Sequence, residues 1–236
     1  MSNLNNNQYS SYYEVDYSIV ANRGIASPFV YYMHSKVEKH STTSDKAKIL
    51  EIAAGNGEHL SHRRTIGNLY VLSDYNPRML ENAKNRFKNS EYKNSLSFVS
   101  ADIYTLPFDD ESFDQIVVTC LLHHLADLNK AFMEIKRVIK PKGRITIYVS
   151  CDPGVVNRII RKLIIIPRAR KYSKINYENF IATEHFRHFS SIRTILRNFF
   201  YDDSIREYFY PLKLKSWNFN AFCIFEIRKG ELNDQE

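Results

Sequence analysis

Short apolar segments alternate with segments of helical character between Lys48 and Val149, and this alternation constrains the fold more than any other feature. Five segments rich in Val, Ile, Leu and Phe have the length of strands: Lys48–Ile52, Leu69–Ser73, Leu96–Ser100, Phe113–Thr119 and Arg144–Val149. Between them, the patterns beginning at Glu58, Pro77 and Asp127 are typical of helices. Because strands separated by helices form parallel βαβ units, we expect a doubly wound α/β fold.

The chain after Cys151 follows a different pattern and carries the excess charge. A basic helical region runs to about Phe200, and strand-like segments follow at Ser204–Tyr210 and Trp217–Arg228. From Cys151 to Lys215 there are 13 basic and 6 acidic residues, whereas the rest of the chain has 20 of each. The net charge of +7 is therefore local, and it permits an anionic partner at this region.

Cysteine usage and hydropathy exclude several classes of protein. Cys120, Cys151 and Cys223 are far apart and lack metal-ligand spacing, so we expect neither a disulfide framework nor a zinc site. The acidic run Asp109–Asp114 lacks the ligand spacing of a calcium loop. The polar N-terminus does not resemble a secretory signal, and the aliphatic cluster Ile159–Ile166 is too short to cross a bilayer. We expect a soluble cytoplasmic protein without a metal, with peripheral membrane contact left open.

Polar residues and glycines stand where the first three expected strands end. Gly55 and Gly57 form a turn that lets a ligand approach the backbone closely. Asp74 follows the second strand and is suited to accept hydrogen bonds from ribose hydroxyls, while Asp102 follows the third and is suited to an exocyclic amine. Each feature alone is more often a tight turn, a helix cap or a solvated carboxylate. Three of them at neighbouring strand ends favour a nucleotide-like ligand.

Five ordered segments resemble motifs of the class I S-adenosylmethionine-dependent methyltransferases. They are Ile49–Gly57, Asp74–Leu80, Ala101–Asp114, Leu121–Leu125 and Glu134–Gly143. The resemblance is strong from Lys48 to Val149 and weak over the last two strands. It implies a Rossmann-like doubly wound sheet of about seven strands, mostly parallel with an antiparallel last strand, and a helical cap after strand five. One departure is Ala53, which replaces the first glycine of the family's loop and crowds the approach to the backbone.

The resemblance also implies a cofactor, S-adenosylmethionine, with S-adenosylhomocysteine as product. Glu51 and the loop 53–57 would surround its methionine portion, Asp74 its ribose, Asp102 its adenine, and Cys120 its sulfonium end. The full set of implied cofactor contacts is Glu51, Ala53, Gly55, Asn56, Gly57, Asp74, Tyr75, Met79, Asp102, Ile103, Cys120 and Leu121. Within a single domain, the resemblance divides the chain into an N-terminal lid (1–47), a cofactor-binding core (48–150), a basic acceptor-side cap (151–189) and a C-terminal part (190–230).

His123 and His124 follow the fourth strand and are the candidate catalytic residues. Methyl transfer to a hydroxyl requires removal of a proton, and imidazole has a pKa near the working pH. Some sugar O-methyltransferases of this family are thought to use this pair as a base. The alternative is that the pair only shapes the pocket, and the sequence favours neither.

The acceptor side is predicted from the lid and the cap. The lid offers Tyr17, Arg23, Tyr31 and His34 as contacts. The cap offers four further candidates, Asp152, Glu184, His185 and His188. Asp152 is also suited to cap the following helix, and the His and Glu cluster is also suited to a structural role between cap and core.

Several acceptor classes fit the basic cap. We favour O-methylation of a small molecule, sugar or glycan, with an anionic or lipid-linked acceptor in view of the local charge. Nucleic acid is disfavoured, because the segment after strand four reads Cys-Leu-Leu-His-His and lacks the Pro-containing motifs of DNA methyltransferases. The alternatives are a non-catalytic cofactor-binding homologue and, less favoured, an RNA or protein methyltransferase.

Overall fold

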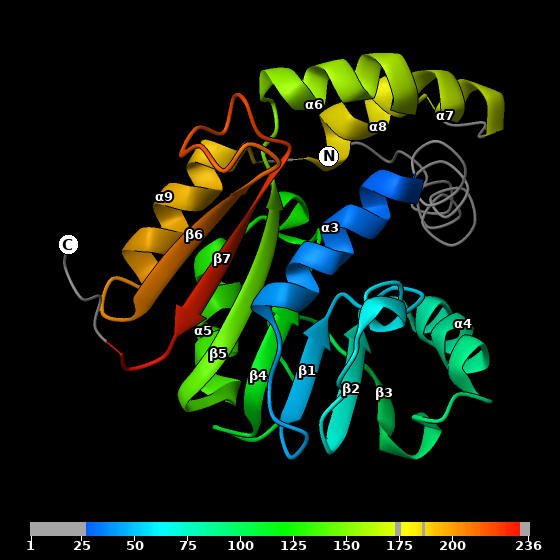
Figure 1. Ribbon diagram of the computed structural model, residues 1–236. Helices are drawn as coiled ribbons and strands as arrows, with labels where there is room; N and C mark the ends of the chain where they lie inside the picture. The colour runs from blue at the N-terminus through cyan, green and yellow to red at the C-terminus, as the bar shows by residue number, and fades with distance from the viewer. Residues whose placement is uncertain (1–26, 173–175, 186, 232–236) are drawn as a thin grey trace.

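The computed structural model describes residues 27–172, 176–185 and 187–231, which form a seven-stranded sheet with helices on both faces (Figure 1). The strands lie in the order β3-β2-β1-β4-β5-β7-β6. Neighbours from β3 to β5 pair in parallel, and β7 is antiparallel to both β5 and β6. Their bounds are β1 Lys48–Ile52, β2 Leu69–Asp74, β3 Leu96–Ser100, β4 Phe113–Val118, β5 Ile139–Ser150, β6 Ser204–Tyr210 and β7 Phe222–Arg228. The expected sheet, with its antiparallel last strand, is confirmed.

The helices begin where local sequence provides a cap. The side chain of Asn76 accepts a hydrogen bond from the backbone of Arg78 and precedes Pro77, and Asp127 caps the next long helix in the same way. The helices are α3 Ser27–His40, η3 Leu60–His62, α4 Pro77–Phe87, η4 Lys93–Ser95, η5 Leu122–His124, α5 Leu128–Val138, α6 Val155–Ile160, η6 Arg161–Ile165, α7 Ile166–Tyr172, α8 Tyr177–Glu184 and α9 Phe189–Phe199. The run α6-η6-α7 is continuous and forms the cap after strand five, together with α8 (Figure 1).

Alternate strand residues build the two halves of the core. In β4, Ile116 packs toward the face covered by α5 and α9, and Val117 packs toward the face covered by α3 and α4. Phe132 of α5 lies against Phe199 and Phe200 at the end of α9, with ring centroids 5.6 and 5.3 Å apart. Both faces of the sheet are therefore buried, which accounts for its nearly continuous apolar strands.

The prediction of a helix beginning at Glu58 is wrong, because only the single turn η3 forms there. Arg63 leaves the turn with an extended backbone, and its buried guanidinium donates to the carbonyl oxygens of Ser41 and Thr65 and pairs with Glu38. These bonds hold the chain away from a second helical turn. The helix α3 packs against η3, β5 and β7.

Within the described ranges, no helix combines the length and apolar character that crossing a bilayer requires.

Candidate cofactor and acceptor site

The loop after β1 has three residues in the left-handed region of the backbone. Ala53, Gly55 and Gly57 have φ angles of 56°, 55° and 72°. A side chain at Gly57 is excluded by packing, since a Cβ there would lie 2.7 Å from the ring of Phe87. The expected crowding at Ala53 thus takes the form of backbone strain, because a residue with a Cβ occupies a conformation that suits glycine.

Asp74 holds this loop at the end of β2. One of its carboxylate oxygens accepts a hydrogen bond from the backbone of Gly55 at 2.8 Å, and the other accepts from the backbone of Asn76 at 2.8 Å. Burial raises the pKa of Asp74, and these backbone bonds oppose the rise. Each oxygen keeps further acceptor capacity, so the carboxylate suits a pair of ribose hydroxyls.

Glu51 is a buried carboxylic acid with one unsatisfied oxygen. Its Oε2 atom accepts from the Tyr70 hydroxyl at 2.7 Å, whereas its buried Oε1 atom has no hydrogen-bond partner among the described residues. Burial raises the pKa of Glu51 to about 7. An orphaned carboxyl oxygen two residues before the loop fits a ligand that brings a cationic amine. The residues present therefore suit the methionine end of S-adenosylmethionine.

The remaining predicted cofactor contacts are spread along the same edge of the sheet. Met79 lies next to the loop, with its methyl 3.2 Å from where a Cβ of Gly55 would stand. Asp102 follows β3 and accepts from the backbone of Tyr104, next to the buried Ile103. Tyr75 is exposed, the Asn56 side chain accepts from Asn82, and Cys120 and Leu121 follow β4, Cys120 with a φ of 55°. Their cofactor roles stay predictions.

A pH dependence of stability follows from Glu51. Its pKa is raised in the folded protein from 4.5 to about 7, so its contribution to stability is full below pH 4.5 and is lost as pH rises through about 7. We expect Glu51→Gln to remove this loss, which amounts to about 3 kcal/mol between pH 4.5 and 8 in the unmodified chain. Urea unfolding at pH 5 and pH 8 measures it. Glu81→Gln, at an exposed position, is the matched control and should leave the difference intact.

The two candidate catalytic histidines differ in their contacts. The two ring nitrogens of His123 lie 2.8 Å from the Arg187 carbonyl oxygen and 3.1 Å from that of Ser150. His124 has its Nδ1 atom 3.0 Å from the Glu184 carbonyl oxygen, which places the proton on Nδ1 and the lone pair on Nε2. Burial lowers the pKa of both, that of His124 to about 4. His123 thus lies between the cap and β5, and its neutral ring donates to one of the two carbonyl oxygens at a time.

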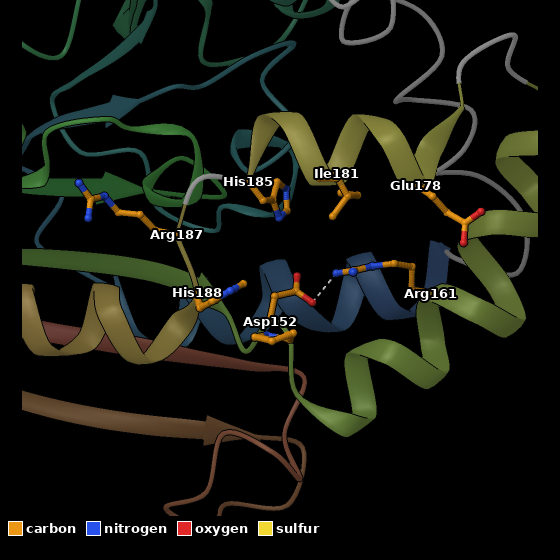
Figure 2. A pocket seen from close by; sticks show the side chains of 9 residues that line it. Asp152, Arg161, Glu178, Ile181, His185, Arg187 and His188 are labelled. Carbon is orange, nitrogen blue, oxygen red and sulfur yellow. Dashed lines mark hydrogen bonds and ion pairs between the residues drawn. The ribbon is translucent and has the colours of Figure 1, made fainter.

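A cavity of about 310 Å³ lies between the cap and the end of β5 (Figure 2). Its lining residues are Asp152, Pro153, Arg161, Glu178, Ile181, Ala182, His185, Arg187 and His188. Asp152 forms an ion pair with Arg161 and accepts from the Ser150 hydroxyl. Three of the four predicted cap contacts therefore meet in one cavity, whereas Glu184 is not part of its lining.

Sequence reasoning missed the partners that the cap supplies. Arg161 and Glu178 line the cavity, but no motif distinguishes them from the other residues of the basic stretch. It also missed Tyr177 of α8. Burial raises the pKa of Tyr177 to about 12, and the charges of Arg161, Asp152 and Cys120 also affect it. Tyr177 is the first residue of α8, directly before the lining residue Glu178.

The expected lid is described only from residue 27 onward, so Tyr17 and Arg23 lie outside the described residues. Tyr31 is exposed, and His34 is buried with its ring stacked on His62 at 4.9 Å. Burial lowers the pKa of His34 to about 3. Over the part of the chain that the structure describes, no group of His, Cys, Asp and Glu side chains is arranged to hold a metal ion.

Comparison with known proteins places the core in a family. Residues 50–147 match the family model described as a methyltransferase domain. The demethylmenaquinone methyltransferase of Clavibacter sepedonicus is 35% identical over 108 residues, which cover 46% of this chain and 43% of that protein. The ubiquinone/menaquinone biosynthesis C-methyltransferase UbiE of Hahella chejuensis is 33% identical over 119 residues, covering 49% and 47%. The chain thus spans less than half the length of these relatives.

A solved structure shows the same fold over most of the chain. The N-methyltransferase NodS from Bradyrhizobium japonicum has a TM-score of 0.60 and 18% identity, covering 86% of this chain and 98% of that chain. This likeness shows the fold, and the sequence motifs fall at the strand ends described above. Residues 50–147 therefore match a methyltransferase domain, and the match implies S-adenosylmethionine as the methyl donor.

Proposed function

We propose that the chain transfers a methyl group from S-adenosylmethionine to a hydroxyl of a small molecule bound in the cap cavity. The observation that carries this proposal is the position of the cavity. It adjoins Asp152, directly after β5, and β5 pairs in parallel with β4, which Cys120 follows. In open α/β sheets ligands bind at the carboxyl ends of the strands, so an acceptor in this cavity would lie beside the cofactor site.

Size and polarity of the cavity favour a compact polar acceptor. A volume of about 310 Å³ is at the lower end for ligand pockets and suits one sugar or one ring of a larger molecule. Asp152, Arg161 and His185 offer a carboxylate, a guanidinium and an imidazole to such an acceptor. These groups hydrogen-bond hydroxyls in both directions, which supports a sugar or another polyhydroxylated compound.

The chain's own contribution is to position the acceptor and to take its proton. When bound, S-adenosylmethionine supplies an electrophilic methyl group. His124 is the better candidate base. It does not line the cavity, but its ring centroid lies 4.9 Å from that of the lining residue His185. Its Nδ1 proton is donated to the Glu184 carbonyl oxygen, and its Nε2 atom carries the lone pair. With a pKa lowered to about 4, His124 is neutral at pH 7. His123 positions the cap through the carbonyl groups of Arg187 and Ser150.

A second candidate is C-methylation of a quinol ring. It is supported by the names of the two curated relatives, which act in menaquinone or ubiquinone biosynthesis. Their similarity covers 46% and 49% of this chain and less than half of their own length, so it is weak support for a shared acceptor.

Formation of S-adenosylhomocysteine with a panel of acceptors separates these functions. We expect turnover with hydroxylated acceptors, represented by neutral sugars, uronates and simple phenols. Turnover with demethylated naphthoquinols alone would establish the second candidate instead. If the chain binds S-adenosylmethionine and forms no product with any acceptor, a non-catalytic role replaces both. Mass spectrometry of the product locates the new methyl group on oxygen or carbon.

A further inference from the structure

Exposed apolar side chains are concentrated in two segments of the described chain. Of its eleven exposed large apolar residues, seven lie in the helical run 155–172 or in the loop 211–219. These seven are Val155, Ile159, Leu163, Tyr172, Leu212, Leu214 and Phe219. We call the surface formed by these two segments the cap face. Such a concentration is unusual for a solvated surface and indicates a binding partner.

The helical part of the cap face has apolar residues on two sides. Val156 and Ile160 pack inward against the core. Val155, Ile159 and Leu163 recur every four residues beside this inner row and are exposed, with Leu163 69% exposed. The inner row supports the fold, whereas the outer row faces solvent.

Basic residues accompany these apolar side chains, and acids are missing. Arg158 and Lys162 are exposed within the helical row, and Lys213 and Lys215 alternate with the leucines of the loop. The sequence contains no Asp or Glu from residue 153 to 177, nor from 208 to 225. The cap face is therefore both apolar and strongly positive.

The two segments form one surface. The backbone of Val156 donates to the Asn218 carbonyl oxygen at 3.3 Å, and a Cβ at Gly154 would lie 2.7 Å from the Trp217 carbonyl oxygen. In Figure 1 the run α6-η6-α7 and the β6–β7 loop lie at the same end of the molecule, away from the lower ends of the strands.

We propose that the cap face docks on an anionic lipid bilayer. Apolar side chains flanked by Lys and Arg bind the boundary between headgroups and acyl chains, and anionic headgroups complement the positive charge. The same run contributes Arg161 to the cavity lining, so docking would hold the cavity close to the bilayer. The inference concerns binding alone and does not depend on methyl transfer.

Co-sedimentation of the full chain with vesicles tests whether the positive charge of the cap face contributes to membrane binding. We expect binding to an equal mixture of phosphatidylcholine and phosphatidylglycerol, weak binding to phosphatidylcholine alone, and loss of binding at high salt. Reversal of two cap-face charges, Lys213→Glu with Lys215→Glu, should weaken binding by about 30-fold or more, given roughly 1 kcal/mol for each basic residue near the surface. The matched control is the double variant Lys84→Glu with Lys88→Glu. Lys84 lies on α4 and Lys88 directly follows it, both side chains are exposed, and this variant should bind vesicles normally.

An apolar substitution provides the second measurement. Leu214→Gln should weaken binding by roughly 10-fold, because this side chain would enter the acyl boundary. Met133→Gln is its control, since Met133 on α5 is 55% exposed and Leu214 is 56% exposed. Equal loss in control and test variants would overturn the proposal, as would absence of binding to anionic vesicles. A chain that ignores vesicles and forms dimers through Leu214 would show a self-association surface instead.

Discussion

Asp74→Ala is expected to lower the affinity for S-adenosylmethionine by about 100-fold or more. Hydrogen bonds to a charged group contribute about 1.5–3 kcal/mol each, and the carboxylate is placed to accept two from a ribose. The substitution also removes the acceptor of the Gly55 backbone hydrogen bond, so the loop after β1 loses a contact that fixes its conformation. Calorimetric titration with S-adenosylhomocysteine measures the affinity.

Two further variants separate binding from folding. Asp74→Asn keeps one acceptor oxygen and should retain part of the affinity. Asp109→Ala removes a charge at an exposed turn and should leave the affinity unchanged. Thermal unfolding without ligand shows whether each variant folds. A folded Asp74→Ala protein with unchanged affinity would disprove the ribose assignment.

His124→Asn is expected to lower kcat by about 100-fold or more, because a positioned base typically contributes a factor of 100 to 10,000. The asparagine amide can still donate to the Glu184 carbonyl oxygen in place of Nδ1, so the cap contact is kept while the base is lost. The KM for the acceptor and the melting temperature should change little. Initial rates of S-adenosylhomocysteine formation, with the best acceptor of the panel, measure the effect.

The pH profile gives an independent check on His124. A base acts in its unprotonated form, and burial lowers the pKa of His124 to about 4, so kcat should be level near pH 7 and fall as pH drops through about 4. The comparison variant is His123→Asn, which changes the contacts of the adjacent His123 ring with the backbone and leaves His124 in place. Full turnover by both the His124→Asn and the His123→Asn variants would leave the pair with a shaping role only.

The sheet and its ligand edge could be predicted because they depend on local patterns. Strands β1 and β3 have the expected bounds, and β2 extends the expected segment by one residue, to Asp74. Since parallel strands end at the same edge, Glu51, Asp74 and Asp102 had to lie along it whatever their side chains contact. The strain at Ala53 was also foreseeable, because a Cβ replaces a glycine of the loop.

The cap and the first helix could not be predicted in the same way. The pairing of Asp152 with Arg161, and the contacts of His123 with Arg187 and Ser150, depend on how the cap folds back onto the sheet. The missing helix after Glu58 depends on Arg63, whose partners include Ser41 at the far end of α3. Long-range contacts of this kind leave no periodicity in the sequence.

The packing of α3 has a consequence for the order in which the protein folds. Its last residue, His40, hydrogen-bonds the Tyr210 hydroxyl at 2.7 Å, and Phe29 packs edge-on against Phe222. These contacts join residues separated by 170 or more positions. On the ribosome, α3 is synthesised well before β6 and β7, which carry Tyr210 and Phe222. We therefore expect the helix to dock after the strands have paired, with the apolar face of the sheet that it covers exposed to chaperones until then.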